Sequence, residues 1–150
     1  MEWWRSKIIA PLKTQLTQGV TPTRLAVALA LGAVIGIVPI MGVTTVITAV
    51  LAVSLRLNQP AIQVANYAAT PFQLALFIPL FQAGSALFGA PPVSFTLAQI
   101  QAEMAADSGG TLLRYLGANL RAVGVWALLA PLIFAALFLA FRALLSRLPR

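Results

Sequence analysis

The sequence predicts an all-α fold: a small polytopic α-helical membrane protein with an N-terminal interfacial helix, a broken, re-entrant helical hairpin and two further membrane segments. Of its 150 residues, 60% are hydrophobic and only 9% are charged, whereas soluble domains carry roughly 25% charged residues. Long uncharged stretches alternate with short segments that hold the Lys and Arg residues. This alternation is typical of membrane segments and their flanking cations.

The first element expected is an amphipathic helix over residues 1–18. Trp4, Ile8, Leu12 and Leu16 recur every fourth residue, away from the basic side chains. A basic helix with Trp on its apolar side suits the headgroup region of a bilayer. The alternative is a frayed basic tail. Residues 19–150 are expected to form a single α-helical membrane domain.

The second element is the hairpin, residues 22–55. Thr21 is a favourable N-cap for its first helix. No charge interrupts residues 25–55, but Pro39 and Gly42 divide them into two arms of roughly 15 and 13 residues. Each arm would reach about 20–23 Å, less than a hydrocarbon core of about 30 Å. We therefore expect a hairpin that enters and leaves on one membrane face; a single kinked helix is the alternative.

A stripe of small residues marks the first arm of this hairpin. Ala28, Gly32 and Gly36 are spaced four residues apart, so they share one helix face. Such a stripe lets another helix backbone approach closely. We expect it to serve internal packing rather than a dimer interface.

Three more elements follow the hairpin. Residues 58–90 are expected to form a broken membrane segment, interrupted at Pro71. Residues 94–108 have the pattern of a short amphipathic helix outside the apolar core. The last element is a transmembrane helix over residues 111–148, whose centre, residues 122–141, carries no charge.

The distribution of cations predicts the orientation. If the hairpin returns to its starting face, eight of the ten Lys and Arg residues lie on one side, and only Arg114 and Arg121 lie on the other. A single crossing by residues 25–55 would divide them six to four. The positive-inside rule favours the first arrangement. We therefore expect a multi-pass membrane protein with both termini in the cytoplasm.

The amino-acid composition does not favour catalysis or nucleic-acid binding. The chain has no Cys and no His, and its carboxylates are limited to Glu2, Glu103 and Asp107. The usual metal ligands and acid–base groups are therefore scarce, and we expect neither an enzyme nor a cofactor. The net charge of +7 includes no basic run, so nucleic acid is not an expected partner.

The candidate binding residues are polar or cationic groups beside the breaks. Arg24 lies in a first helical turn, where a cation is disfavoured unless an anion sits nearby. The hairpin would bring Arg56 back to the same membrane face. Amides within apolar segments also need partners. The candidate lipid- or substrate-binding residues are Thr21, Arg24, Arg56, Asn58, Asn66, Thr70 and Gln73.

One string of residues resembles a bacterial membrane family known as domain of unknown function 2062. The residues that carry the resemblance are Gly19–Ala26 (GVTPTRLA), Ala30-Leu31-Gly32, Ile35-Gly36, Pro39, Gly42, Arg56–Pro60 (RLNQP) and Pro71. The family usually has Asn-Pro where this chain has Thr70-Pro71. The resemblance implies a small inner-membrane protein, and some members resemble extensions of membrane glycosyltransferases. It thereby suggests handling of lipid-linked sugars or polyprenyl phosphates.

Three functional hypotheses remain at this point. The first is a transporter or flippase that binds an anionic lipid or a polyprenyl-phosphate-linked substrate. Its breaks resemble the discontinuous helices of transporters. The second is a non-catalytic assembly or scaffold subunit of a membrane complex such as a glycosyltransferase system. The third is an enzyme acting on lipid. Expected partners are anionic membrane lipids together with a second copy or another membrane protein.

Overall fold

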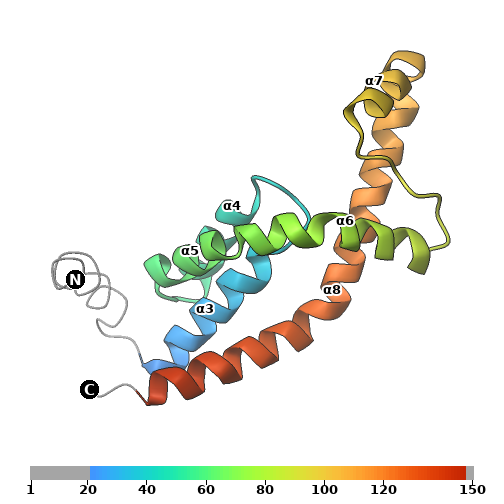
Figure 1. Cartoon of the computed structure of the whole chain (residues 1–150). Coiled ribbons are helices and arrows are strands. Elements are labelled where there is room, and N and C mark those ends of the chain that lie inside the picture. The colour runs from blue at the N-terminus through green and yellow to red at the C-terminus, as the bar shows by residue number, and fades with distance from the viewer. Residues whose placement is uncertain (1–20, 148–150) are drawn as a thin grey trace, which may run out of the picture.

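The computed structural model describes residues 21–147, and within this range all regular elements are helices (Figure 1). The predicted all-α class is therefore confirmed for this part of the chain. The expected interfacial helix, residues 1–18, lies outside the described residues. The helices are α3 (Pro22–Gly36), α4 (Thr44–Ser54), α5 (Gln59–Ala68), α6 (Thr70–Leu87), α7 (Leu97–Ala106) and α8 (Ser108–Ser146).

Helix α3 begins and ends at local sequence signals. The Thr21 side chain accepts a hydrogen bond from the Arg24 N–H at 3.3 Å, and proline occupies the first turn. Residues 37–43 are not helical, because Pro39 cannot donate to a helical hydrogen bond and disfavours helix in the residue before it. Gly42 has a φ of +82°, a conformation that glycine adopts without steric cost.

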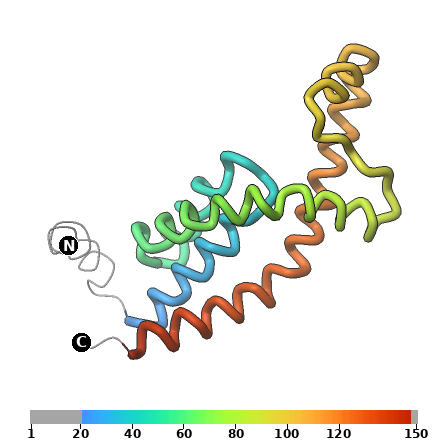
Figure 2. Tube along the Cα trace, viewed as in Figure 1, coloured from blue at the N-terminus to red at the C-terminus, as the bar shows by residue number. Residues whose placement is uncertain are grey.

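Helix α4 folds back along α3, as Figure 2 shows. Ala52 near the end of α4 belongs to the same buried cluster as Leu25 and Ala28 near the start of α3. The two helices are therefore antiparallel. At 1.5 Å per residue, 15-residue α3 and 11-residue α4 extend about 22 Å and 16 Å.

Helix α5 runs parallel to α3 and packs closely against it. Its N-cap is Asn58, whose side chain accepts from the Ala61 N–H at 2.8 Å. A Cβ added at Gly32 would lie 2.2 Å from the Ile62 carbonyl oxygen, and one at Gly36 would lie 2.8 Å from the Asn66 carbonyl oxygen. The small-residue stripe thus lies against α5 within this chain.

The broken segment consists of α5 and α6, which are bent by 53° relative to each other. The bend falls at Ala69, shortly before Pro71, whose missing N–H and ring disfavour a straight helix. Pro79, in contrast, lies inside α6 without ending it.

Helix α8 is 39 residues long and packs against α3, α6 and α7. Its C-terminal part follows α3, whereas its middle part crosses α6 (Figure 1). Gly84 permits this crossing, because a Cβ there would lie 2.9 Å from the Arg121 carbonyl carbon. A second buried cluster fills the contact, formed by Leu80, Phe81, Ala118, Ala122 and Val125.

The two final helices differ from their expected bounds. Helix α7 covers residues 97–106 rather than 94–108, since Asp107 caps a new helix by accepting from the Gly110 N–H at 2.9 Å. Helix α8 therefore begins at Ser108 rather than 111. Asp107 is extended, with φ −154° and ψ 94°, and this single residue separates α7 from α8.

Within the described residues, one helix is long and apolar enough to cross a membrane. This helix is α8, and the bent pair α5–α6 would add a second span. The most apolar 18-residue window of α8 has a mean hydropathy of 2.4 and is only 11% buried. Large apolar side chains also point outward from α4, where Val46, Val50 and Val53 are 62%, 58% and 76% exposed.

Candidate functional site

Four arginines gather at one end of the molecule, and we call this group the basic end. The buried cluster that contains Leu25 is also contacted by Leu57 and Leu145. The start of α3, the α4–α5 turn and the end of α8 therefore lie close together. The exposed arginines beside them are Arg24, Arg56, Arg142 and Arg147. Among residues 21–147 the ion pair found is Arg114–Glu103, so the basic end carries net positive charge.

The non-helical stretch after α3, residues 37–43, interrupts the helical hydrogen bonding. Three side chains that are distant in the sequence donate hydrogen bonds to backbone carbonyls in or beside this stretch. Gln73 on α6 donates to the Val38 carbonyl at 2.7 Å. Asn119 on α8 donates to the Pro39 carbonyl at 2.6 Å. Trp126 on α8 donates its indole N–H to Val34, in the last turn of α3, at 3.0 Å. Because helix ends leave carbonyls without helical partners, these bonds hold the break inside the protein.

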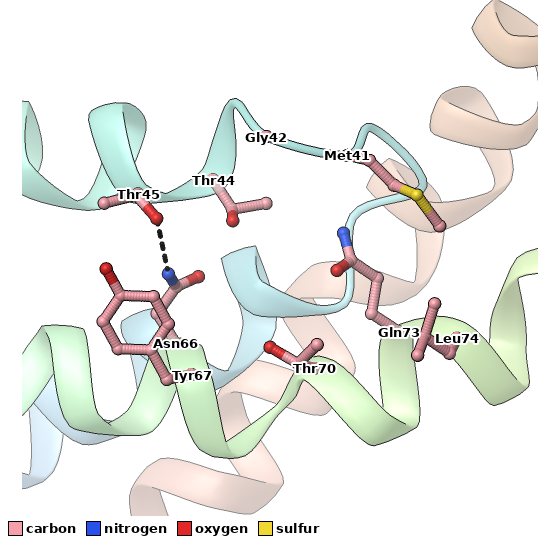
Figure 3. Close-up of a pocket in the computed structure, with 9 residues that line it drawn as sticks. All are labelled: Met41, Gly42, Thr44, Thr45, Asn66, Tyr67, Thr70, Gln73 and Leu74. Carbon is pink, nitrogen blue, oxygen red and sulfur yellow. Dashed lines mark hydrogen bonds between the residues drawn. The ribbon is translucent and has the colours of Figure 1, made fainter.

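A pocket of about 270 Å³ lies where this break meets the α5–α6 bend (Figure 3). Its lining comes from residues 41–45 on one side and residues 66–74 on the other. The lining residues are Met41, Gly42, Thr44, Thr45, Asn66, Tyr67, Thr70, Gln73 and Leu74. None of them carries a formal charge at neutral pH, so the polar groups in the lining are hydroxyls, amides and backbone groups.

Asn66 is the most buried polar side chain in this pocket. It is only 2% exposed, and its Nδ2 donates to the Thr45 hydroxyl at 3.5 Å. Its Oδ1 is buried and has no hydrogen-bond partner among the described residues. Figure 3 shows this oxygen pointing between α4 and the α5–α6 bend, into the space that Thr44 and Thr70 also face. An unpaired buried amide oxygen costs about 1–3 kcal/mol, so a donor there would be stabilising.

The neighbouring Gln63 has a similar arrangement. Its Nε2 donates to the Thr45 carbonyl at 3.2 Å, whereas its Oε1 is buried without a partner in the described part of the chain. Thr48 donates its hydroxyl to the carbonyls of Thr44 and Thr45. The Gln63 bond therefore connects the first turn of α4 to α5, whereas the Thr48 bonds lie within α4.

The structure divides the predicted site residues into two groups. Asn66, Thr70 and Gln73 line the pocket beside Gly42, with Pro39 and Pro71 forming the breaks on either side. Thr21, Arg24, Arg56 and Asn58 lie instead at the opposite ends of α3 and α5. The 12 residues from Arg24 to Gly36 on α3 place these groups about 18 Å apart. The two groups cannot contact one small ligand together.

Three of the other charged residues have structural partners away from this pocket. Glu103 pairs with Arg114, and Asp107 caps α8. Both line a separate cavity of about 360 Å³ between α7 and α8. The described residues contain no group of three acidic, His or Cys side chains placed to hold a metal ion. The two acids therefore stabilise the α7–α8 corner.

Asn119, Trp126 and Gln63 were absent from the predicted site. Asn119 lies just before the uncharged centre of the last helix, residues 122–141. An amide beside an apolar membrane segment needs a hydrogen-bond partner. This requirement was the sequence signal that could have identified Asn119. Trp126 gives no comparable signal, because tryptophan is common at membrane boundaries without a specific hydrogen bond.

The fold and the pocket define a small all-α protein with a membrane-span candidate and a polar pocket between broken helices. A family model described as "uncharacterized protein conserved in bacteria", domain of unknown function 2062, matches residues 6–148. The chain belongs to this family, as the resemblance in its sequence predicted. No curated protein and no solved structure matches the chain.

Proposed function

We propose that this chain is a multi-pass protein of the bacterial inner membrane that binds and translocates an anionic lipid or a polyprenyl-phosphate-linked substrate. It acts without catalysing a reaction. The basic end faces the cytoplasm and attracts the anionic headgroup. The pocket at the breaks accepts the headgroup within the membrane. The single observation that carries this proposal is the uncharged polar pocket, which lies between broken helices in a chain with an apolar exterior.

The exterior of α8 supports the membrane setting. A soluble protein buries its most apolar helix, whereas the apolar window of α8 is only 11% buried. Arg121 and Arg142 bound the uncharged part of this helix and are 21 residues apart. This separation is about 31 Å, close to the hydrocarbon thickness of about 30 Å.

The hydrogen bonding at the non-helical stretch between α3 and α4 also supports a position within the membrane. Backbone polar groups at membrane depth must be paired inside the protein. The carbonyls of Val38 and Pro39 receive hydrogen bonds from Gln73 and Asn119. A solvent-exposed turn would obtain these partners from water and would not need hydrogen bonds from remote helices. This pairing supports a re-entrant hairpin formed by α3 and α4.

The charge distribution supports the orientation. Four arginines at the basic end contrast with Glu103, Asp107 and Arg114 at the α7 corner. The positive-inside rule assigns the basic end to the cytoplasm, and anionic lipids of that leaflet are attracted to such clusters. The pocket would then lie about 18 Å from the cytoplasmic surface, past the middle of the bilayer.

A flipping assay tests the proposal. Purified protein is reconstituted into vesicles that contain fluorescent phosphatidylglycerol, and a membrane-impermeant reductant reports the lipid reaching the outer leaflet. We expect faster transfer with the protein than in empty vesicles. Replacing Arg24 and Arg56 together by Gln should slow transfer, whereas the control Arg114→Gln at the opposite end should not. Transfer no faster than in empty vesicles would refute translocation.

A scaffold role has one observation in its favour. Leu112, Leu113, Leu116 and Leu120 are 64%, 69%, 53% and 63% exposed on α8. This stretch lies outside the uncharged part of α8, so lipid does not fully account for it. Stable co-purification with one membrane protein after gentle extraction, together with absent lipid transfer, would favour this second function.

A further inference from the structure

The pocket combines hydrogen-bond donors at one wall with an unpaired acceptor at another. Gly42, Thr44 and Thr45 form the first wall, where α4 begins. No side chain caps this helix. The N-terminus of a helix presents free N–H groups and the positive end of the helix dipole. The first wall therefore favours an anion.

The second wall is formed by the α5–α6 bend. Here the buried Asn66 Oδ1 lacks a partner within residues 21–147, and Thr70 lies one helical turn further along. An amide oxygen is only an acceptor, and it pairs with a hydroxyl or an ammonium group. This wall therefore favours a donor on the same ligand that presents an anion to α4.

We propose that this pocket binds a phosphate ester that also carries hydroxyl groups, such as a phosphoglycerol or phosphosugar headgroup. The phosphate lies against the start of α4, and a hydroxyl donates to Asn66 Oδ1. This assignment rests on the proposed function, because it names the headgroup that the translocated lipid carries. It goes beyond that function by requiring hydroxyl groups in addition to negative charge.

The surroundings of the pocket exclude a metal cation as its preferred occupant. The lining residues include no carboxylate, and the positive end of α4 repels a cation. The cavity of about 270 Å³ falls just below the range of about 300–1,000 Å³ that holds drug-sized ligands. It therefore fits a headgroup, whose acyl or prenyl chains would extend along the apolar exterior.

Native mass spectrometry of the detergent-purified full chain tests this assignment. The two probes are phosphatidylglycerol and phosphatidylpropanol, which have the same charge but differ in their headgroup hydroxyls. We expect about fivefold preference for phosphatidylglycerol, because one additional hydrogen bond contributes about 1 kcal/mol. The Thr70 hydroxyl faces the same space as Asn66 Oδ1 (Figure 3) and can bond the second headgroup hydroxyl, so Thr70→Val should weaken this preference and Asn66→Leu should abolish it. The control Thr23→Val removes a hydroxyl outside the pocket and should retain it.

Further arms distinguish the possible outcomes. Soluble glycerol phosphate that displaces the lipid would assign the pocket to a free ester, whereas retention of the lipid would assign it to a lipid headgroup; both results support the pocket chemistry. Equal retention of both lipids, with anionic lipids still preferred over zwitterionic ones, would overturn the headgroup assignment and leave the proposed function intact. Absence of any anionic preference would overturn both. Because Thr70 is exposed, Thr70→Val remains informative if Asn66→Leu fails to fold.

Discussion

Replacing Gly32 by Ala tests the packing on which the pocket depends. A Cβ at this position would lie 2.2 Å from the Ile62 carbonyl oxygen and 2.9 Å from Ala65 Cβ. Ordinary contact begins near 3.4 Å. The backbone oxygen cannot rotate away, so α3 and α5 would have to separate by about 1 Å. A gap of this size forfeits a quarter to a half of the dispersion energy of each separated contact.

The expected change in the free energy of unfolding combines two opposing contributions. Overpacking a close contact costs about 1–3 kcal/mol, and we expect the upper end because backbone meets backbone. The change from Gly to Ala inside a helix returns about 1 kcal/mol. Gly32→Ala should therefore lower the free energy of unfolding by about 2 kcal/mol.

Gly117 offers a matched control on α8. A Cβ there would meet only the Arg121 Nη1 atom at 3.5 Å, which is an ordinary contact. Gly117→Ala should raise the free energy of unfolding by up to about 1 kcal/mol. Unfolding by SDS in mixed micelles, followed by far-ultraviolet circular dichroism, measures both variants. If Gly32→Ala is as stable as Gly117→Ala, the close α3–α5 packing described above is wrong.

Three further substitutions test individual hydrogen bonds by the same unfolding assay. Gln73→Leu should cost about 1–3 kcal/mol, because it leaves the buried Val38 carbonyl without its 2.7 Å donor; an unchanged stability would show that this bond does not hold the break. Trp126→Phe should cost about 1 kcal/mol through loss of the 3.0 Å bond to Val34, and a neutral effect would count against that contact. Asn58→Ala should cost about 1 kcal/mol, because it removes the α5 cap; Asn58→Ser should restore most of this loss, and failure to do so would contradict a capping role.

Local signals predicted much of the hairpin. Thr21 caps α3, as predicted, and precedes a proline in the first helical turn. Pro39 and Gly42 lie in the non-helical stretch that separates α3 from α4. Each of these features depends on backbone geometry within a few residues, so sequence alone carries the information.

The boundary between α7 and α8 was predicted less well, again for a local reason. The expected bounds, 94–108 and 111–148, placed Gly109 and Gly110 between the two helices. They lie instead in the first turn of α8, where Asp107 accepts from the Gly110 N–H. A side-chain cap outweighed the low helix propensity of glycine, which costs about 1 kcal/mol per residue.

The candidate site required contacts that sequence could not supply. Asn119 reaches the Pro39 carbonyl across 80 residues, and Trp126 reaches Val34 across 92 residues. The sequence also suggested one site containing both Arg24 and Asn66. Their separation depends on α3 and α5 being parallel, which places the arginine and the amide at opposite ends. No local pattern distinguishes this arrangement from a single cluster.

Thiol labelling tests the membrane topology most directly, because the chain has no native Cys. Ala98 on α7 and Ser146 at the end of α8 are both exposed, and each can be replaced by Cys in an otherwise unchanged protein. A membrane-impermeant maleimide is added to intact spheroplasts and to lysed ones. We expect Ala98→Cys to react before lysis and Ser146→Cys to react only after lysis. Protection of Ala98→Cys until lysis, or reaction of Ser146→Cys in intact spheroplasts, would contradict the proposed topology.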